Sequence, residues 1–183
     1  MLSVLKRLPS SITTLPAADA YPLLALITIS AVLGILIVGR MSRFFIVRPV
    51  RDARIIIPLV LISFIFPAMF EELLFRALIM PAAGEASSHR WAWALLSTAV
   101  FVVYHPLNGR FLFRPGRTVF TDARFLTLSA LLGAACSVLY LVSGSIWPSI
   151  LVHWLFVSAW LLILGGYDRM YRGRQWNAPA LDG

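Results

Sequence analysis

Charged residues and cysteine are both scarce in this sequence. Of its 183 residues only 13% are charged, whereas 60% are hydrophobic and the mean hydropathy is +0.84. Because soluble domains carry about 25% charged residues, this composition excludes an ordinary soluble domain. It predicts an integral membrane protein.

The single cysteine, Cys136, lies inside an apolar run. One thiol allows no disulfide framework within the chain, so we interpret Cys136 as a small packing residue. Internal repeats at a solenoid or propeller period are also missing, and no segment is low in complexity. Residues 21–39 lack an A-x-A cleavage site and are long enough to cross a bilayer, so we expect a membrane span there and not a removed signal peptide.

Acidic residues are the rarer charge, eight against sixteen basic ones, which gives a formal net charge of +8. A basic chain can bind nucleic acid, but the arginines here lie almost entirely in the gaps between apolar runs, as membrane-flanking arginines do. We therefore expect no nucleic-acid partner, and we expect the lipid bilayer to surround the chain.

Five apolar runs predict membrane helices. They cover residues 21–39, 55–80, 91–105, 125–142 and 146–165. We expect an all-α integral membrane protein, a bundle of about five transmembrane helices with a polar site at membrane depth, multi-pass in the cell (inner) membrane. The chain then divides into an N-terminal surface segment, the first span with a basic connector, a core and a C-terminal tail, at residues 1–20, 21–54, 55–166 and 167–183.

Five spans would place the two termini on opposite sides of the bilayer. One side would hold both basic connectors and the C-terminal tail, with Arg40, Arg43, Arg48, Arg51, Arg54, Arg110, Arg114, Arg117, Arg124, Arg169, Arg172 and Arg174. The other side would hold only Lys6, Arg7 and Arg90. By the positive-inside rule the arginine-rich side is cytoplasmic.

Three ionisable residues, Glu71, Glu72 and Arg76, interrupt the second apolar run. Each charge at a bilayer centre costs roughly 2.5–3.5 kcal/mol on insertion scales, so such groups are usually paired or functional. Glu72 and Arg76 stand four residues apart in the order that favours a helical ion pair. Glu71 points about 100° away from Glu72 around the helix and has no local partner. It is therefore a candidate general base that takes a proton from water. The alternative is that all three form a satisfied structural cluster.

Pro67 lies one turn before the acidic pair and predicts a kink, with a freed carbonyl that a water can occupy beside Glu71. Ser129, Gly133 and Ser137 recur at i, i+4 and i+8 in a later span, which predicts a close contact between helices.

Two of the three histidines, His105 and His153, lie in apolar spans, whereas His89 lies in a polar turn and is interpreted as a surface residue. Two buried imidazoles and an acidic pair on three different helices indicate a functional constellation. Counting helical rises, Glu71 and His153 fall at similar depths. His105 falls deeper, which requires tilt or a different boundary of the third span.

The order of these residues resembles the CAAX proteases and bacteriocin-processing enzymes, known as the CPBP or Abi family of glutamic-type intramembrane endopeptidases. The family pattern is E-E-x-x-x-R, then F-x-x-x-H, then H-x-x-x-[ND] on successive helices. Glu71, Glu72 and Arg76 match the first element, and Phe101 and His105 match the second. The third matches only in His153, because Val157 stands where Asn or Asp is expected. The resemblance covers roughly residues 55–166.

This resemblance implies hydrolysis of a peptide bond in a membrane-associated peptide or protein. Glu71 with His105 would activate the attacking water, and His153 would help to stabilise the oxyanion. At position 157 a backbone group or another polar side chain, such as Ser149, would have to replace the missing donor, or the oxyanion site is weaker. We expect no cofactor and no metal. Zinc is the alternative, since one carboxylate and two imidazoles are an acceptable ligand set, although no H-E-x-x-H pair is present.

Two other functions stay open at this point. A catalytically degenerate scaffold or partner-binding protein of the same family would explain Val157, and a proton relay or small transporter could use the acids and imidazoles. Five spans without an internal repeat disfavour a transporter. The orientation is also open, because family members that trim prenylated proteins open to the cytosol, whereas Glu71 and His153 lie nearer the arginine-poor end of their spans.

Overall fold

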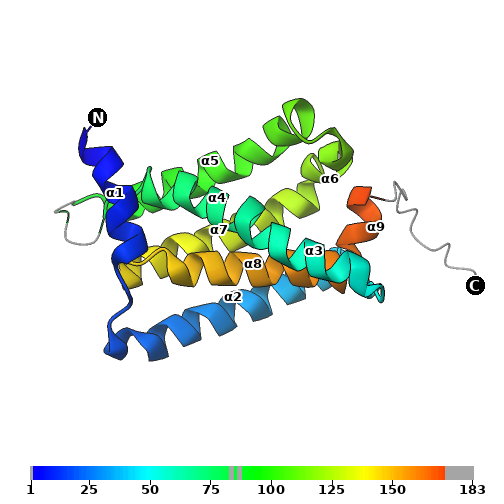
Figure 1. Cartoon of the computed structure of the whole chain (residues 1–183), viewed down its shortest axis with the longest axis horizontal. Coiled ribbons are helices and arrows are strands. Elements are labelled where there is room, and N and C mark those ends of the chain that lie inside the picture. Colours follow the sequence, from blue (N-terminus) through cyan, green and yellow to red (C-terminus); the bar gives the residue numbers. More distant parts are fainter. Residues whose placement is uncertain (1, 83–84, 86–87, 172–183) are drawn as a thin grey trace, which may run out of the picture.

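The computed structural model describes residues 2–82, 85 and 88–171, the side chains of residues 2–6 excepted. Helices dominate this part of the chain, which contains no strand beyond one isolated bridge between Arg48 and Leu164. The helices run in an elongated bundle (Figure 1). In chain order they are α1 (Leu2–Thr13), η1 (Ala18–Ala20), α2 (Tyr21–Met41), α3 (Ala53–Ser63), η2 (Phe64–Met69), α4 (Phe70–Glu72), η3 (Leu73–Ala77), α5 (Arg90–Phe111), η4 (Arg114–Gly116), α6 (Arg117–Phe120), α7 (Ala123–Ser143), α8 (Trp147–Leu162) and α9 (Gly166–Tyr171).

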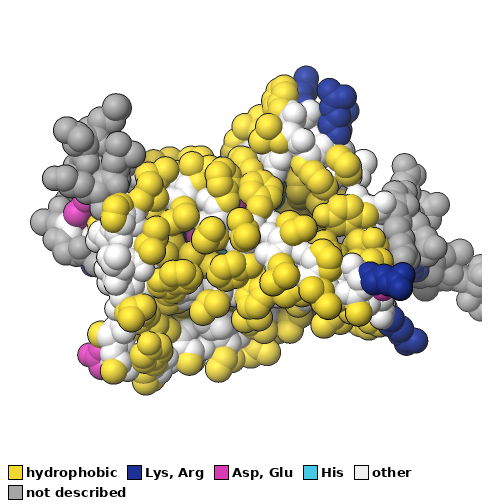
Figure 2. All heavy atoms as spheres, viewed as in Figure 1, with side chains coloured by type: hydrophobic (Ala, Val, Ile, Leu, Met, Phe, Trp, Pro, Cys, Tyr) yellow, Lys and Arg dark blue, Asp and Glu magenta, His cyan; other side chains and the backbone are white. Residues whose placement is uncertain are grey.

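Three helical stretches in the described residues are long and apolar enough to cross a membrane: Ala18–Met41, Ala53–Ala77 and Ala123–Ser143. The apolar helix α8 is shorter, and α5 is long but carries polar residues. Hydrophobic side chains cover most of the visible surface between the two ends (Figure 2). Apolar surface of this extent belongs in lipid, which confirms the predicted all-α membrane bundle.

The helix α7 packs against α5, α2 and α8. Its predicted stripe of small residues is buried, and the Ser137 hydroxyl lies 3.2 Å from that of Thr98 on α5. At Gly133 the backbone carbonyl accepts a hydrogen bond from Arg76 Nη2 at 2.7 Å. The stripe therefore brings the helices together, as predicted, and lets the buried arginine reach the α7 backbone.

Substituting alanine for Gly133 is expected to lower the free energy of unfolding by about 1–3 kcal/mol, the usual cost of overpacking. A Cβ atom there would lie 2.9 Å from Phe101 Cδ1 and 3.3 Å from Arg76 Nη2. Denaturant titration of the detergent-solubilised protein measures the change. Gly34→Ala is the matched control, because a Cβ atom there meets nothing within 4 Å. Equal stability losses at the two glycines would contradict the packing described here.

The second predicted span is a broken helix formed by α3, η2, α4 and η3. Phe66, directly before Pro67, has non-helical backbone angles (φ −138°, ψ 117°), and the turns on either side of α4 are π-helical. The kink predicted from Pro67 is confirmed, and Glu71 and Glu72 follow it in α4. The break thus starts a new helical direction just before the acidic pair.

The third span is longer than its apolar run. We predicted that it would end at His105, but α5 continues through Pro106 to Phe111. A membrane helix tolerates proline when its neighbours satisfy the freed backbone group. Figure 1 shows α5 inclined to α8, which accounts for the depth mismatch of His105. The extension also makes Asn108 a helical residue, one turn beyond His105.

The arginine-rich end is held together by backbone hydrogen bonds. The amides of Ile46, Arg48 and Val50 donate to the carbonyls of Leu164, Ile163 and Leu162, at 3.3, 2.8 and 2.8 Å. This extended segment satisfies carbonyls that the end of α8 would otherwise leave without partners. Basic side chains gather at this end in Figure 2. Arg172 and Arg174 of the predicted tail lie outside the described residues.

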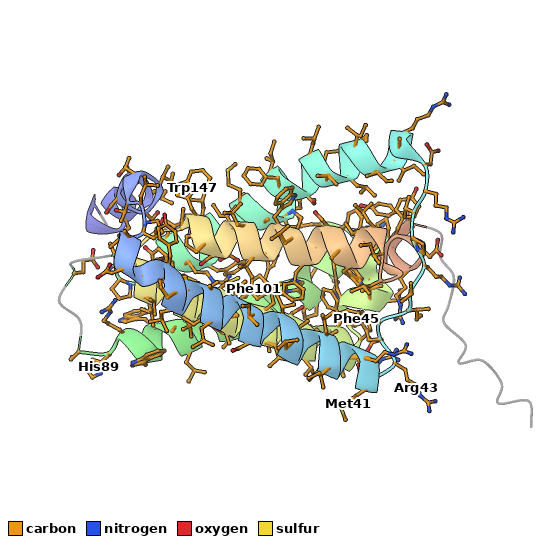
Figure 3. The ribbon with its side chains drawn as sticks, turned by 90° about the horizontal axis from the view of Figure 1, so that it is seen from below. Met41, Arg43, Phe45, His89, Phe101 and Trp147 are labelled. Carbon is orange, nitrogen blue, oxygen red and sulfur yellow. The ribbon has the colours of Figure 1, made fainter. Side chains whose placement is uncertain are left out.

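The helix α1 lies across the opposite end of the bundle. Arg7 pairs with Glu85 at 2.9 Å, and Trp147 Nε1 donates to the Ile12 carbonyl at 2.9 Å. Figure 3 shows Trp147 and His89 at this end and Phe45 at the other, with Phe101 between the helices midway. His89 is exposed, in agreement with its predicted surface position.

Candidate active site

The five predicted site residues come from four elements and are all buried. Glu71 and Glu72 lie on α4, Arg76 on η3, His105 on α5 and His153 on α8. Their exposed fractions are 2%, 0%, 0%, 7% and 2%, in that order. Buried ionisable groups in a membrane bundle need partners or a function, so their contacts separate the two possibilities.

Glu72 is the paired acid. Its Oε1 accepts hydrogen bonds from Arg76 Nη1 at 3.0 Å and from His153 Nδ1 at 2.7 Å. The Arg76 guanidinium also lies over the Phe101 ring, 4.7 Å from its centroid. The predicted ion pair is confirmed, and it extends to a histidine on another helix. Glu72 and Arg76 therefore hold the His153 ring in place.

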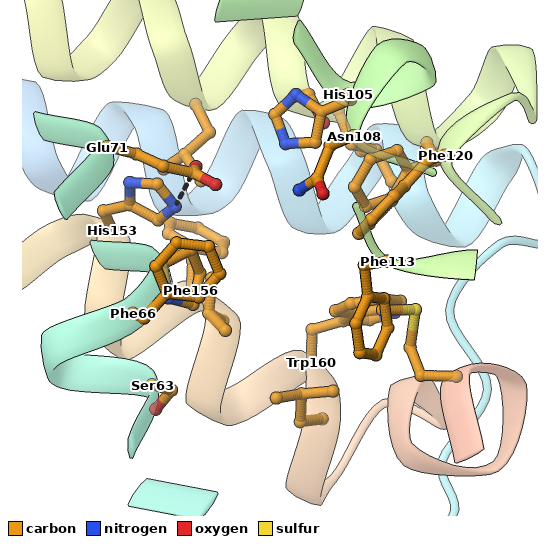
Figure 4. A pocket seen from close by; sticks show the side chains of 18 of the residues that line it. Ser63, Phe66, Glu71, His105, Asn108, Phe113, Phe120, His153, Phe156 and Trp160 are labelled. Carbon is orange, nitrogen blue, oxygen red and sulfur yellow. Dashed lines mark ion pairs between the residues drawn. The ribbon is translucent and has the colours of Figure 1, made fainter. Parts of the chain in front are cut away.

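Glu71 differs from Glu72 in its contacts. Its Oε2 has no hydrogen-bond partner among the described residues and makes a longer ion-pair contact with His153 Nε2, at 3.7 Å. The side chain faces a cavity (Figure 4). The predicted lack of a local partner is confirmed. A buried carboxylate in this position is chemically able to accept a hydrogen bond and a proton from a water molecule.

Both histidine rings are fixed through Nδ1. His105 Nδ1 lies 2.8 Å from the Phe101 carbonyl, and His153 Nδ1 lies on the Glu72 carboxylate. Because carbonyl and carboxylate oxygens only accept, Nδ1 carries the proton in each ring, and a neutral ring then has a basic Nε2. Both rings also pack edge-on against Phe101, with centroids 4.7 and 5.7 Å away.

Glu71, His105 and His153 line one cavity of about 280 Å³. Aromatic side chains supply much of the remaining wall, among them Phe44, Phe113, Phe120, Phe125, Phe156 and Trp160. The cavity extends from Glu71 toward the arginine-rich end, because Phe45 and Met170 also line it. Its polar groups are thus gathered at one part of a largely apolar chamber.

Residues 53–159 match the family model described as "Rce1-like: Type II CAAX prenyl endopeptidase Rce1-like". The matched range covers more than half of the chain and contains all five site residues. The chain belongs to the Rce1-like family. Rce1-like proteins are CAAX proteases, so the family resemblance inferred from the three motifs is confirmed. No curated protein and no solved structure matches the chain.

Sequence reasoning missed the polar residue Asn108 of this Rce1-like site. It is buried and lines the cavity three residues after His105. The spacing of one helical turn was a usable signal, but the predicted end of the helix at Pro106 placed Asn108 in a connector. Val157 lines the same cavity, whereas the Ser149 hydroxyl donates to the Cys136 carbonyl at 2.8 Å and is not a lining group.

The zinc alternative would use Glu71 and the Nε2 atoms of His105 and His153. Within residues 2–82, 85 and 88–171, no group of three or more His, Cys, Asp or Glu side chains is arranged to hold a metal ion. The expectation of no metal stays a prediction, and removal of metal ions by a chelator tests it.

Proposed function

We propose that this Rce1-like chain is an intramembrane endopeptidase that hydrolyses a peptide bond of a membrane-associated substrate with water activated by Glu71. One observation carries the proposal: the buried Glu71 carboxylate has an oxygen without a described partner, in a cavity that it shares with two imidazoles. Glu72 also has one oxygen without a described partner, but its other oxygen accepts from Arg76 and His153. Glu71 accepts no such pair of bonds and faces the cavity, and a buried acid held in this way is costly unless it has a function.

The reaction follows from the basic groups of the cavity. Glu71 takes a proton from water, and the water oxygen forms a bond to the scissile carbonyl carbon. The tetrahedral intermediate collapses as the C–N bond breaks, and the abstracted proton passes to the leaving amine. Nε2 of His153, 3.7 Å from Glu71 Oε2, is well placed to help move this proton. His105 faces the same space from α5 and orients the water with Glu71.

The cavity wall supports an apolar segment as the substrate. Ile62 and Phe66 line the cavity although they are 60% and 47% exposed, so the cavity reaches the lipid-facing surface at the break in the second span. A membrane-embedded chain can enter there. The family description names a prenyl endopeptidase, and we propose prenylated peptides as the first substrates to test.

The extent of the cavity also bears on orientation. It runs toward the arginine-rich end, and the positive-inside rule makes that end cytoplasmic. We propose a multi-pass inner-membrane enzyme whose site is reached from the bilayer and from the cytoplasmic side. This orientation reconciles the arginine distribution with cytosolic processing.

The purified chain in proteoliposomes is expected to cleave a fluorogenic peptide whose fourth residue from the C-terminus is a farnesylated cysteine. The same peptide without the farnesyl group shows whether the lipid chain is required. An increase in fluorescence with the parent and none with Glu71→Gln supports the proposal. A parent chain that cleaves neither peptide would argue against an endopeptidase.

Chelation is expected to leave the cleavage rate unchanged, because no step uses a metal ion. The rate is measured before and after dialysis against 1,10-phenanthroline and again after addition of zinc. A rate that falls on dialysis and returns with zinc would support the zinc alternative instead.

Val157 favours a second candidate, a degenerate scaffold of the same family. In that case the parent is inert and Val157→Asn gains hydrolysis, since the substitution restores the polar side chain of the family pattern. Cleavage by the parent itself excludes the scaffold.

A further inference from the structure

The proposed reaction needs a hydrogen-bond donor that the basic groups do not supply. A tetrahedral oxyanion is stabilised by donors aimed at it in a water-poor site. A Glu71 carboxylate is an acceptor, and an imidazole whose single proton is on Nδ1, engaged by Phe101 or Glu72, presents Nε2 as a base. Glu71, His105 and His153 supply the groups that accept protons, but the group that donates a hydrogen bond to the oxyanion has still to be identified.

Three other polar side chains line the cavity: Ser63, Ser129 and Asn108. The Ser63 hydroxyl donates to the Val60 carbonyl and contacts Ser158, both at 3.1 Å. Ser129 offers a single O–H from α7. Asn108 offers two N–H donors, and its side chain makes no hydrogen bond with any other residue that the structure describes.

The backbone around Asn108 is held firmly. Its carbonyl accepts from the amides of Leu112 and Phe113 at 2.9 and 2.8 Å, and the side chain is only 5% exposed. In Figure 4 the Asn108 amide lies beside His105 and faces the space in front of Glu71 and His153. A buried donor on a well-held backbone needs less reorganisation when charge develops than a donor on a surface loop.

We propose that Asn108 is a catalytic residue that donates a hydrogen bond to the oxyanion and replaces, from α5, the polar side chain that Val157 does not provide on α8. This inference rests on the proposed endopeptidase function. Both residues line the same cavity, so one amide can reach a common substrate carbonyl from the opposite wall. Val157 then departs from the family pattern without loss of the donor, because the donor lies on α5 in place of α8.

Asn108→Leu, which keeps the side-chain volume and removes the donor, is expected to lower kcat for the farnesylated peptide about 10²-fold or more with little change in KM. Ser129→Ala tests the other candidate donor, because the Ser129 hydroxyl also lines the cavity. A kcat for Asn108→Leu within twofold of the parent would overturn the inference, and so would a larger loss in Ser129→Ala.

A double variant that moves the amide from position 108 to position 157 distinguishes a catalytic role of Asn108 from a structural one. The double variant Asn108→Leu/Val157→Asn is expected to regain at least about tenfold in kcat over Asn108→Leu, because it returns an amide to the same cavity. A merely structural asparagine would show no such recovery. A double variant as slow as Asn108→Leu would overturn the proposal.

Binding of a peptidyl trifluoromethyl ketone, whose hydrate resembles the tetrahedral intermediate, gives a second readout. Asn108→Leu is expected to weaken this binding at least tenfold and to leave binding of the cleaved product peptide unchanged. Equal losses for both ligands would overturn the proposal. A parent that cleaves no peptide defeats the endopeptidase function and this inference together, whereas an active parent with a fully active Asn108→Leu defeats this inference alone.

Discussion

Glu71→Gln is expected to lower the rate of peptide cleavage by about 10²–10⁴-fold, the usual contribution of a general base. Glutamine keeps the size of the side chain but cannot take a proton from water at this position. The rate of farnesylated-peptide cleavage in proteoliposomes measures the loss. Because the parent buries a carboxylate oxygen without a described partner, the neutral amide should not lower the thermal midpoint.

The matched control for this substitution is Glu85→Gln. Glu85 is a partly exposed acid that pairs with Arg7 at the arginine-poor end, so its loss should leave cleavage within about twofold of the parent, as for a surface pair. If Glu71→Gln cleaved the peptide as fast as Glu85→Gln does, Glu71 would not be the base.

Arg76→Met is expected to lower the free energy of unfolding by about 3–5 kcal/mol, as when one partner of a buried ion pair is removed. Arg76 is fully buried and donates to Glu72 and to the Gly133 carbonyl. Methionine fills most of the volume but leaves Glu72 without its cation, although His153 still donates to it, and leaves the Gly133 carbonyl without its donor. Denaturant titration in detergent micelles measures the change.

Two controls distinguish the loss of this buried ion pair from the general effect of removing an arginine. Arg7→Met removes a partly exposed pair and should cost about 1 kcal/mol or less. Glu72→Gln/Arg76→Met removes both charges and keeps an acceptor for His153, so it should recover part of the stability lost in Arg76→Met. A single variant as stable as the parent would show that Glu72 needs no cation.

The features that sequence alone predicted are those that depend on local order along the chain. Uninterrupted hydropathy located the helices, and a spacing of four residues located the Glu72–Arg76 pair. Pro67 located the break, because a missing backbone amide disturbs the helix wherever the proline lies.

The features that sequence missed depend on contacts between helices. The bond from His153 to Glu72 joins residues 81 positions apart, and no pattern on either helix indicates it. The predicted end of α5 was wrong because Pro106 was taken as a helix terminator, whereas in the folded protein the helix continues to Phe111. That error also removed Asn108 from the predicted site, although it stands one turn from His105.

The most direct test of the account is an experimental density map of the parent protein in lipid nanodiscs with a peptidyl trifluoromethyl ketone bound. We predict the hydrated ketone inside the cavity, with one hydroxyl within hydrogen-bond distance of the Glu71 carboxylate and the other at the Asn108 amide. A ligand held elsewhere in the bundle, with neither oxygen near Glu71, would contradict the claim that this buried acid activates the attacking water.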